Sequence, residues 1–284
     1  MRATSILAFP AAIGGGAAGR ATGVRIVAVL VRAMHLARSL GLALVLWWVV
    51  AAWLHRPLSL PTPWPVLSTW WSLAADGELA RQTLVSLRRL AIAYILAAVI
   101  GIPLGFAMGL WRSVDRAAGP IVNAVRAISG IAWIPLAVVW FGVSEALPVF
   151  IIGYGALFPF VLNAQAAMTN RDARLSTVAR TLGAGRVRIA LMIVLPAALP
   201  YLLIGARIAL GLAWMSIIAA ELLGAPSGLG YSIEYSRMLQ QTPRMLAWIL
   251  WVGAAGYLLD AVVRSLFAWL APWSGAGRLA RGAR

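Results

Sequence analysis

Side chains that could do acid–base or metal chemistry are sparse in this chain. Its 284 residues include 8 acidic side chains, 2 histidines and no cysteine, which excludes disulfides, thiolate ligands and a nucleophilic thiol. His35 and His55 flank the first long apolar run. Either could ligate a metal, but a single histidine beside such a run is more typical of a polar anchor at a membrane interface. Without paired carboxylates or metal-spaced histidines, the sequence predicts a non-enzymatic protein with no metal or cofactor of its own.

Three carboxylates lie within or beside apolar runs, namely Glu145, Glu221 and Asp260. Ionisable groups at membrane depth are what an ion-gradient-driven transporter uses to carry protons or bind sodium. Asp260 precedes Arg264 by four residues on a predicted helix, so a structural ion pair is favoured there. Glu145 and Glu221 are predicted near helix ends, where a carboxylate can reach water. A secondary transporter, driven by an ion gradient, is therefore one hypothesis for the function of this chain.

Uncharged polar, aromatic and small side chains inside apolar runs are natural candidates for the lining of a solute path. They are Ser129, Trp133, Asn163, Gln165, Trp214 and Ser216. Helix packing is the alternative explanation for each of them. Arg207 is predicted about 12 Å inside the fifth apolar segment, at about 1.5 Å per residue. There it either snorkels to the membrane surface or faces the bundle interior near an inner gate.

The elements that position these side chains are long apolar segments. Of all residues 62% are hydrophobic and 11% charged, and the mean hydropathy is +0.87, as in proteins whose main solvent is lipid. Continuous apolar runs exclude a barrel, whose strands would alternate. The predicted fold is an all-α membrane protein with six transmembrane helices, at 37–54, 88–110, 121–142, 146–169, 199–222 and 245–268.

The distribution of arginine predicts the orientation. All 24 basic residues are arginine, and the formal net charge is +16. With a cytoplasmic N-terminus and six crossings, 17 arginines lie on the cytoplasmic side, 6 lie outside and Arg207 lies within a span. The positive-inside rule then places both termini in the cytoplasm. The basic charge reflects this topology, and nucleic acid is not a predicted partner because no soluble basic face is evident.

The chain is expected to comprise an N-terminal tail (1–36), a transmembrane domain (37–268) and a basic C-terminal tail (269–284). The first tail is rich in Ala, Gly and Arg and is expected to be a disordered cytoplasmic segment. A transit peptide has a similar composition, and Met34 is an alternative start. Prolines and tryptophans between 57 and 71 predict a short interfacial helix. Small residues four apart, at 101, 105 and 109 and again at 205, 209 and 213, predict close helix packing.

The most informative segment is the hydrophilic loop 171–190, which the topology places in the cytoplasm. Helical spacing sets Leu175, Val178 and Leu182 on one side and arginines on another. Gly183 follows as a predicted turn or helix end. An ordinary basic loop lying on the membrane is the alternative.

This loop resembles that of the permease subunits of bacterial ATP-binding-cassette importers, which reads Glu-Ala-Ala, three residues, Gly, nine residues, Ile-x-Leu-Pro. Ala179, Gly183, Ile193, Leu195 and Pro196 match this pattern at the same spacing, whereas Thr177 replaces the glutamate and Val178 the first alanine. The resemblance covers about residues 60–268, with a family core at about 83–268. It is closest to the nitrate, sulfonate, taurine and bicarbonate branch, with supporting stretches at 101–105, 132–136, 220–223 and 227–231.

The resemblance implies a type I importer permease in the bacterial cytoplasmic membrane. Its implied partners are two ATPase subunits that bind ATP and magnesium, a second permease copy and an extracytoplasmic solute-binding protein. The implied solute is a small anion such as sulfonate, taurine or nitrate. The implied ATPase contacts are Thr177, Val178, Ala179, Leu182, Gly183, Arg186, Ile193, Leu195 and Pro196. The residues themselves agree that the ATPase is a separate chain. A nucleotide-binding P-loop requires a lysine, and this chain has none.

Overall fold

The computed structural model describes residue 34 and residues 38–39, 41–54 and 59–270, without the side chains of Ala173, Arg186, Ala268 and Leu270. Both histidines and most of the two predicted tails lie outside the described residues. The chain divides into two units, Met1–Pro63 and Trp64–Arg284. In the first unit an apolar helix runs over Gly41–Leu54, and the Trp47 indole Nε1 donates a hydrogen bond to the Pro61 carbonyl at 3.1 Å.

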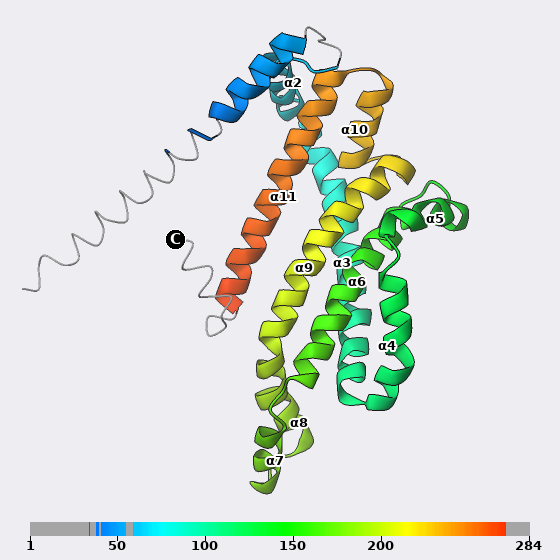
Figure 1. The fold of residues 1–284 in the computed structure, drawn as a ribbon, viewed down its shortest axis with the longest axis vertical. Coiled ribbons are helices and arrows are strands. Elements are labelled where there is room, and N and C mark those ends of the chain that lie inside the picture. The colour runs from blue at the N-terminus through cyan, green and yellow to red at the C-terminus, as the bar shows by residue number, and fades with distance from the viewer. Residues whose placement is uncertain (1–33, 35–37, 40, 55–58, 271–284) are drawn as a thin grey trace, which may run out of the picture. The chain divides into compact units, whose positions relative to one another are not determined.

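All described elements of the second unit are helical, which confirms the all-α prediction (Figure 1). Shorter helices stand beside four long ones, and two segments at 130–133 and 190–194 are a 3₁₀ helix and a π-helix. The α-helices are α2 (Pro63–Ala75), α3 (Glu78–Leu110), α4 (Arg112–Arg126), α5 (Ile134–Phe141), α6 (Ala146–Thr169), α7 (Ala173–Thr181), α8 (Arg186–Ile189), α9 (Leu195–Gly224), α10 (Leu229–Met238) and α11 (Thr242–Leu270). We call the two ends of this unit the α7 end and the α10 end.

The number of spans differs from the prediction of six. Among the residues that the structure describes, four helices are long and apolar enough to cross a membrane, at Glu78–Leu110, Ala146–Thr169, Val187–Gly224 and Thr242–Phe267. A fifth arises if the bent pair Arg112–Arg126 and Gly130–Phe141 forms one crossing. The helix Gly41–Leu54 belongs to a shorter class, since at about 1.5 Å per residue it reaches about 21 Å.

The prediction of one span over 121–142 was wrong in its shape. The two helices of this region meet at 86°, and Ser129 at the break has an extended backbone (ψ 137°). Pro135 lies in the first turn of α5, where its missing N–H is tolerated and where it favours a new helix start over continuation of the previous one. Two helices joined at a sharp bend therefore stand where a single straight span was predicted, and we call this bend the α4–α5 corner.

Helix α3 begins ten residues before the predicted 88, at Glu78 after a left-handed Gly77 (φ 72°). Its 33 residues extend about 50 Å. Arg89 lies within this helix, where it is buried and pairs with Glu221 of α9. The predicted interfacial helix between the first two spans is present as α2, with Pro63 and Pro65 in its first turn.

The core lies where α6 packs between α3 and α9. Buried Ala93, Ala97, Ala156 and Ala209 keep the helices close. The predicted close approach at the glycine strip of α3 is confirmed. A Cβ on Gly105 would lie 2.7 Å from the Ala164 Cβ of α6, which is closer than van der Waals contact allows.

Enlarging Gly105 should therefore separate α3 from α6. We expect Gly105→Leu to destabilise the purified chain by about 1–3 kcal/mol or more, the usual cost of overpacking, seen as a lower apparent midpoint of thermal unfolding in detergent. Gly211→Leu is the matched control, because a Cβ there meets nothing within 4 Å. Equal midpoints for the two variants would contradict this packing.

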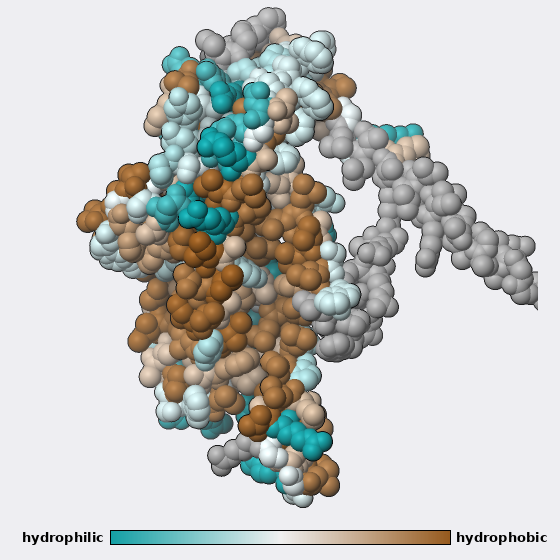
Figure 2. Space-filling model, turned by 180° about the vertical axis from the view of Figure 1, so that it is seen from behind, coloured by the Kyte–Doolittle hydropathy of each residue, from teal (hydrophilic) through white to brown (hydrophobic). Residues whose placement is uncertain are grey.

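The surface of the second unit carries an apolar belt. Figure 2 shows hydrophobic side chains gathered over the middle of one face and hydrophilic ones toward its two ends. Large apolar side chains are widely exposed, among them Ile95 at 60%, Val99 at 64% and Val262 at 62%. Such exposure is stable where the surrounding solvent is lipid or another subunit.

Candidate functional site: a cavity, a coupling segment and a buried ion cluster

A cavity of about 520 Å³ opens between the α4–α5 corner, α6 and α9. Its lining is mostly apolar, with Arg126 as the one charged side chain among the described residues that form it. The polar groups around it are Ser129, Tyr154, Asn163 and Ser216. The cavity thus combines apolar walls with a few hydrogen-bonding groups and one positive charge.

The corner after α4 is what exposes Ser129 to this cavity. Where α4 ends, its last carbonyls lose their helical partners. The Tyr154 hydroxyl of α6 lies 2.5 Å from the Val125 carbonyl oxygen and 2.9 Å from that of Ile128. This contact fixes the end of α4 against α6 and places Ser129 and Arg126 at the cavity.

Asn163 and Ser216 reach the cavity because the opposing helix has a glycine at each contact. A Cβ on Gly205 of α9 would lie 2.6 Å from the Asn163 Cβ, and one on Gly155 of α6 would lie 2.6 Å from the Ser216 Oγ. Asn163 Nδ2 also donates to the Pro159 carbonyl at 2.9 Å. Small residues at these positions therefore allow α6 and α9 to present polar side chains at their seam.

The two tryptophans predicted to line the path lie outside the cavity. Trp133 packs its ring against Trp140 and Tyr154, with ring centroids 6.3 and 5.7 Å apart. Trp214 lies between α9 and α11, where a Cβ on Gly256 would be 2.5 Å from its Nε1. Both side chains fill space between helices.

Gln165 and Arg207 also lie outside the cavity. Gln165 Nε2 donates to Asp115 Oδ1 at 2.7 Å and links α6 to α4. Arg207 Nε donates to Asp260 Oδ1 of α11 at 3.3 Å. The structure therefore brings Ser129, Asn163 and Ser216 together and separates them from the other four candidates.

The predicted coupling segment forms a short helix, α7, at one end of the unit. The Asp172 side chain accepts a hydrogen bond from the Arg174 backbone N–H at 2.9 Å, which caps its N-terminus. Leu175, Val178 and Leu182 are 55%, 56% and 81% exposed. The apolar side of this helix therefore has no cover within the described chain.

Gly183 ends this helix, as predicted. Its φ is +82°, in the left-handed region that glycine adopts without strain, and the Ala184 N–H donates to the Ala179 carbonyl at 2.9 Å. Beyond it, α8 begins at Arg186, and helical structure continues through Ile193 into α9, with Leu195 and Pro196 in the first turn. Thr177 and Val178 are exposed on α7, and residues 182–185 connect α7 to α8.

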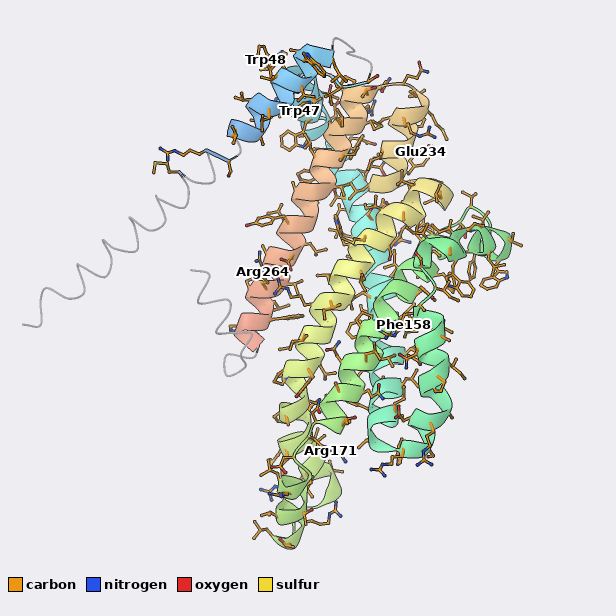
Figure 3. All side chains as sticks on the ribbon, in the orientation of Figure 1. Trp47, Trp48, Phe158, Arg171, Glu234 and Arg264 are labelled. Atoms are coloured by element: carbon orange, nitrogen blue, oxygen red, sulfur yellow. The ribbon has the colours of Figure 1, made fainter. Side chains whose placement is uncertain are left out.

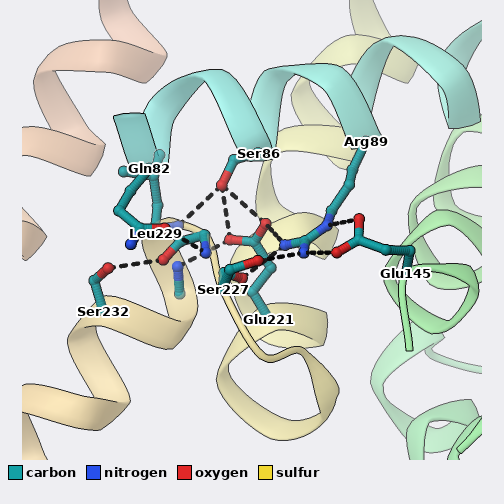
Figure 4. Close-up of polar contacts among 10 residues, drawn as sticks. Gln82, Ser86, Arg89, Glu145, Glu221, Ser227, Leu229 and Ser232 are labelled. Carbon is teal, nitrogen blue, oxygen red and sulfur yellow. Dashed lines mark hydrogen bonds and ion pairs between the residues drawn. The ribbon is translucent and has the colours of Figure 1, made fainter. Parts of the chain in front are cut away.

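A buried ion cluster lies at the opposite, α10 end (Figure 4). Arg89 of α3 is 1% exposed and faces two carboxylates. Its Nη1 lies 2.8 Å from Glu221 Oε1 of α9, and its Nε lies 2.8 Å from Glu145 Oε2 just before α6. Arg89 also donates to the Ser227 carbonyl and hydroxyl, each at 2.7 Å. One guanidinium of α3 thus joins the start of α6 to the end of α9.

The same cluster holds the turn between α9 and α10. The backbone N–H of Gly228 donates to Gln82 Oε1 at 2.8 Å, that of Leu229 to Ser86 Oγ at 2.9 Å, and that of Gly230 to Glu221 Oε2 at 3.0 Å. Gly228 has φ +107°, and a Cβ there would collide with the Glu221 carboxylate. The turn therefore depends on a glycine at position 228 and on the side chains that accept its backbone hydrogen bonds.

The prediction that both Glu145 and Glu221 can reach water holds for Glu145 and is wrong for Glu221. The Glu145 side chain is 53% exposed, and hydrogen bonds from Arg89 lower the pKa of its carboxyl. Glu221 is 1% exposed, because the α9–α10 turn folds over it. Sequence reasoning missed Arg89 as its partner. The available signal was an arginine directly before the apolar run that starts at Leu90, since an arginine buried at such a place requires a counter-charge.

Comparison with known proteins identifies the family. Residues 101–274 match the model of the binding-protein-dependent transport system inner membrane component. The chain is 34% identical over 243 residues to the taurine transport system permease protein TauC of Escherichia coli, covering 84% of this chain and 88% of that protein. It is 35% identical over 199 residues to the bicarbonate transport system permease protein CmpB of Synechococcus elongatus, covering 70% of each.

Among solved structures, the inward-facing MetNI methionine ABC transporter matches with a TM-score of 0.50 and 23% identity, over 65% of this chain and 95% of the matched chain. At that identity the match concerns the fold. The ion-gradient alternative lacks such support. By its sequence and its helical architecture, the chain belongs to the family of binding-protein-dependent transport system inner membrane components and is the non-catalytic permease subunit of an ATP-binding-cassette importer.

Proposed function

We propose that the cavity at the α4–α5 corner is part of an alternating-access route for a small oxyanion. The observation that carries the proposal is the lining of this cavity, in which Arg126 is the one charged side chain among the described residues. Taurine carries a sulfonate and bicarbonate is an anion, and these are the solutes in the names of two relatives. A single arginine beside hydroxyl and amide groups suits a solute with one negatively charged group.

A second permease copy would close this route. The cavity is walled on one side by α9 residues that stay exposed in the single chain, with Ile208 at 48%, Leu212 at 43% and Met215 at 73%. An exposed apolar rim beside a cavity is typical of a surface that another subunit covers. We therefore propose a homodimer, with two ATPase subunits and a binding protein completing the importer.

The proposed topology has six crossings, formed by the segment 37–54, α3, the bent pair α4–α5, α6, α9 and α11. The arginine bias then places both termini and the α7 end in the cytoplasm and the α10 end outside. In this orientation the exposed apolar side of α7 faces the ATPase, with Thr177, Val178, Ala179, Leu182 and Gly183 as the proposed contact. Ile193, Leu195 and Pro196 would carry its motion into α9, and Arg186 would lie at the joint between them.

Accessibility of Ser216 tests the alternating-access route, and the absence of cysteine from the chain makes this direct. Ser216→Cys should be labelled by a membrane-impermeant thiol reagent in proteoliposomes that also contain the ATPase and the binding protein of the importer. We expect the side from which it reacts to change when ATP hydrolysis is trapped. Unchanged labelling in both states would argue against a path at this cavity.

The charge of Arg126 provides a test of solute class. We expect Arg126→Gln to lower uptake of taurine or another sulfonate about tenfold at low solute concentration, because a hydrogen bond to a charged group is lost. Arg116→Gln is the matched control, since Arg116 lies exposed on the same helix and outside the cavity lining. Equal uptake by the two variants would remove Arg126 from the proposed site.

A further inference from the structure

Two arginines share one carboxylate between α9 and α11. Arg207 Nε lies 3.3 Å from Asp260 Oδ1, and Arg264 Nε lies 3.2 Å from Asp260 Oδ2. This confirms the predicted pair of Asp260 with Arg264 and adds Arg207 from another helix. The three side chains, which we call the α9–α11 cluster, have a formal net charge of +1.

The cluster retains unused hydrogen-bonding capacity. Each guanidinium has five N–H donors, yet both arginines approach Asp260 through Nε. Among the described residues, their terminal nitrogens have no hydrogen-bond partner. The side chains of Arg207, Arg264 and Asp260 are 51%, 40% and 39% exposed, so these donors are accessible from outside the helices.

The depth of the cluster corresponds to a layer of lipid headgroups. Arg244 and Arg264 stand near opposite ends of α11, and their separation in sequence corresponds to about 30 Å of helix, the thickness of the hydrocarbon core. With Arg244 at one border, Arg264 lies at the other, and Asp260 lies about one turn inside it. Figure 3 shows Arg264 on the part of α11 remote from the α10 end, which the proposed topology assigns to the cytoplasmic leaflet.

The surface around the cluster is apolar. Leu258 and Val262 of α11 are 54% and 62% exposed, as expected of a helix face in contact with lipid chains. An uncompensated arginine in such surroundings is strongly unfavourable. Asp260 neutralises one of the two positive charges, so a further anion is needed to balance the other.

We infer that the α9–α11 cluster binds the phosphate of an anionic phospholipid of the cytoplasmic leaflet. The phosphate accepts hydrogen bonds from the outward guanidinium nitrogens of Arg207 and Arg264, while the acyl chains of the lipid lie along the exposed apolar face of α11. Basic pockets between transmembrane helices on the cytoplasmic side are a general mode of headgroup recognition. The inference depends on the proposed orientation for the leaflet, and it does not depend on transport.

Lipid binding to the delipidated, purified full chain tests this site. Native mass spectrometry should show phosphatidylglycerol bound more tightly than phosphatidylcholine. We expect Arg207→Gln and Arg264→Gln each to weaken phosphatidylglycerol binding about fivefold, and the double variant more than about tenfold. Arg237→Gln is the matched control, because Arg237 also pairs with a nearby carboxylate, that of Glu234, but lies on α10.

Asp260→Asn separates a lipid site from a purely structural triad. Removing the carboxylate leaves two arginines for the phosphate, so phosphatidylglycerol should bind at least as tightly as to the natural chain. Weaker binding would mean that Asp260 merely ties α11 to α9, and the inference would be wrong. Because the Arg207→Gln, Arg264→Gln double variant leaves Asp260 unpaired, a triple variant with Asp260→Asn serves as its folding control and should also lose the lipid.

Two further outcomes would overturn the inference. Displacement of the lipid by millimolar inorganic phosphate would identify a site for soluble oxyanions. Binding to the detergent-solubilised monomer but not to the dimer in nanodiscs would show that a second copy covers the surface. Persistence of lipid binding in both tests supports the site, and a separate failure of solute uptake would bear on the proposed function alone.

Discussion

Replacement of Arg89 by methionine should destabilise the folded permease by about 3–5 kcal/mol, the usual cost of removing one partner from a buried ion pair. Glu221 is 1% exposed and would lose the guanidinium 2.8 Å away, which leaves a buried acidic group without its counter-charge. The Ser227 carbonyl would also lose its donor. We expect a large fall in the apparent unfolding midpoint of the purified chain and little folded protein in the membrane.

The double variant Arg89→Met, Glu221→Met distinguishes charge burial from loss of packing. Since an apolar pair can replace a buried ion pair at little cost, it should regain part of the lost stability, while Glu145 stays half exposed and hydrated. Arg81→Gln is the matched control on α3. Arg81 pairs with Glu78 on the surface, so its loss should leave the midpoint unchanged. A midpoint of Arg89→Met equal to that of the control would show that the cluster contributes no stability.

Leu182→Asp should separate the permease from its ATPase without unfolding it. Leu182 is 81% exposed at the end of α7, so a charge there disturbs no internal packing. A buried apolar anchor of a protein interface typically contributes at least about 2 kcal/mol, equivalent to about 30-fold in affinity. We expect loss of ATPase co-purification and of solute-stimulated ATP hydrolysis, with an unchanged unfolding midpoint.

Met238→Asp provides the comparison for this prediction. Met238 is 68% exposed and is the last residue of α10, so it lies at the end of the unit opposite to α7. This variant should retain the ATPase in detergent. If Leu182→Asp retained the ATPase equally well, α7 would not be the docking element.

Several features could be predicted from the chain alone because they depend on local properties. Apolar runs require helices in lipid, since each backbone hydrogen bond must be made within the segment. Glycines four residues apart on α3 allow close packing wherever a neighbouring helix lies. Gly183 after an amphipathic turn marks a helix end, and the pattern from Ala179 to Pro196 carries the family resemblance. None of these inferences requires knowledge of which helices are neighbours.

The tertiary structure decided which side chains meet. Arg89 is 132 positions from Glu221 in the chain, and Arg207 is 53 from Asp260, so no helical periodicity could join either pair. The corner at Ser129 also depends on contacts of α6, where the Tyr154 hydroxyl holds the end of α4. Side chains along one helix have their spacing set by its pitch, whereas the neighbours of a buried charge follow from how separate helices pack. The sequence by itself therefore determined the all-helical class and the family and predicted the coupling segment, and packing decided which polar groups border the cavity and where each buried charge finds its partner.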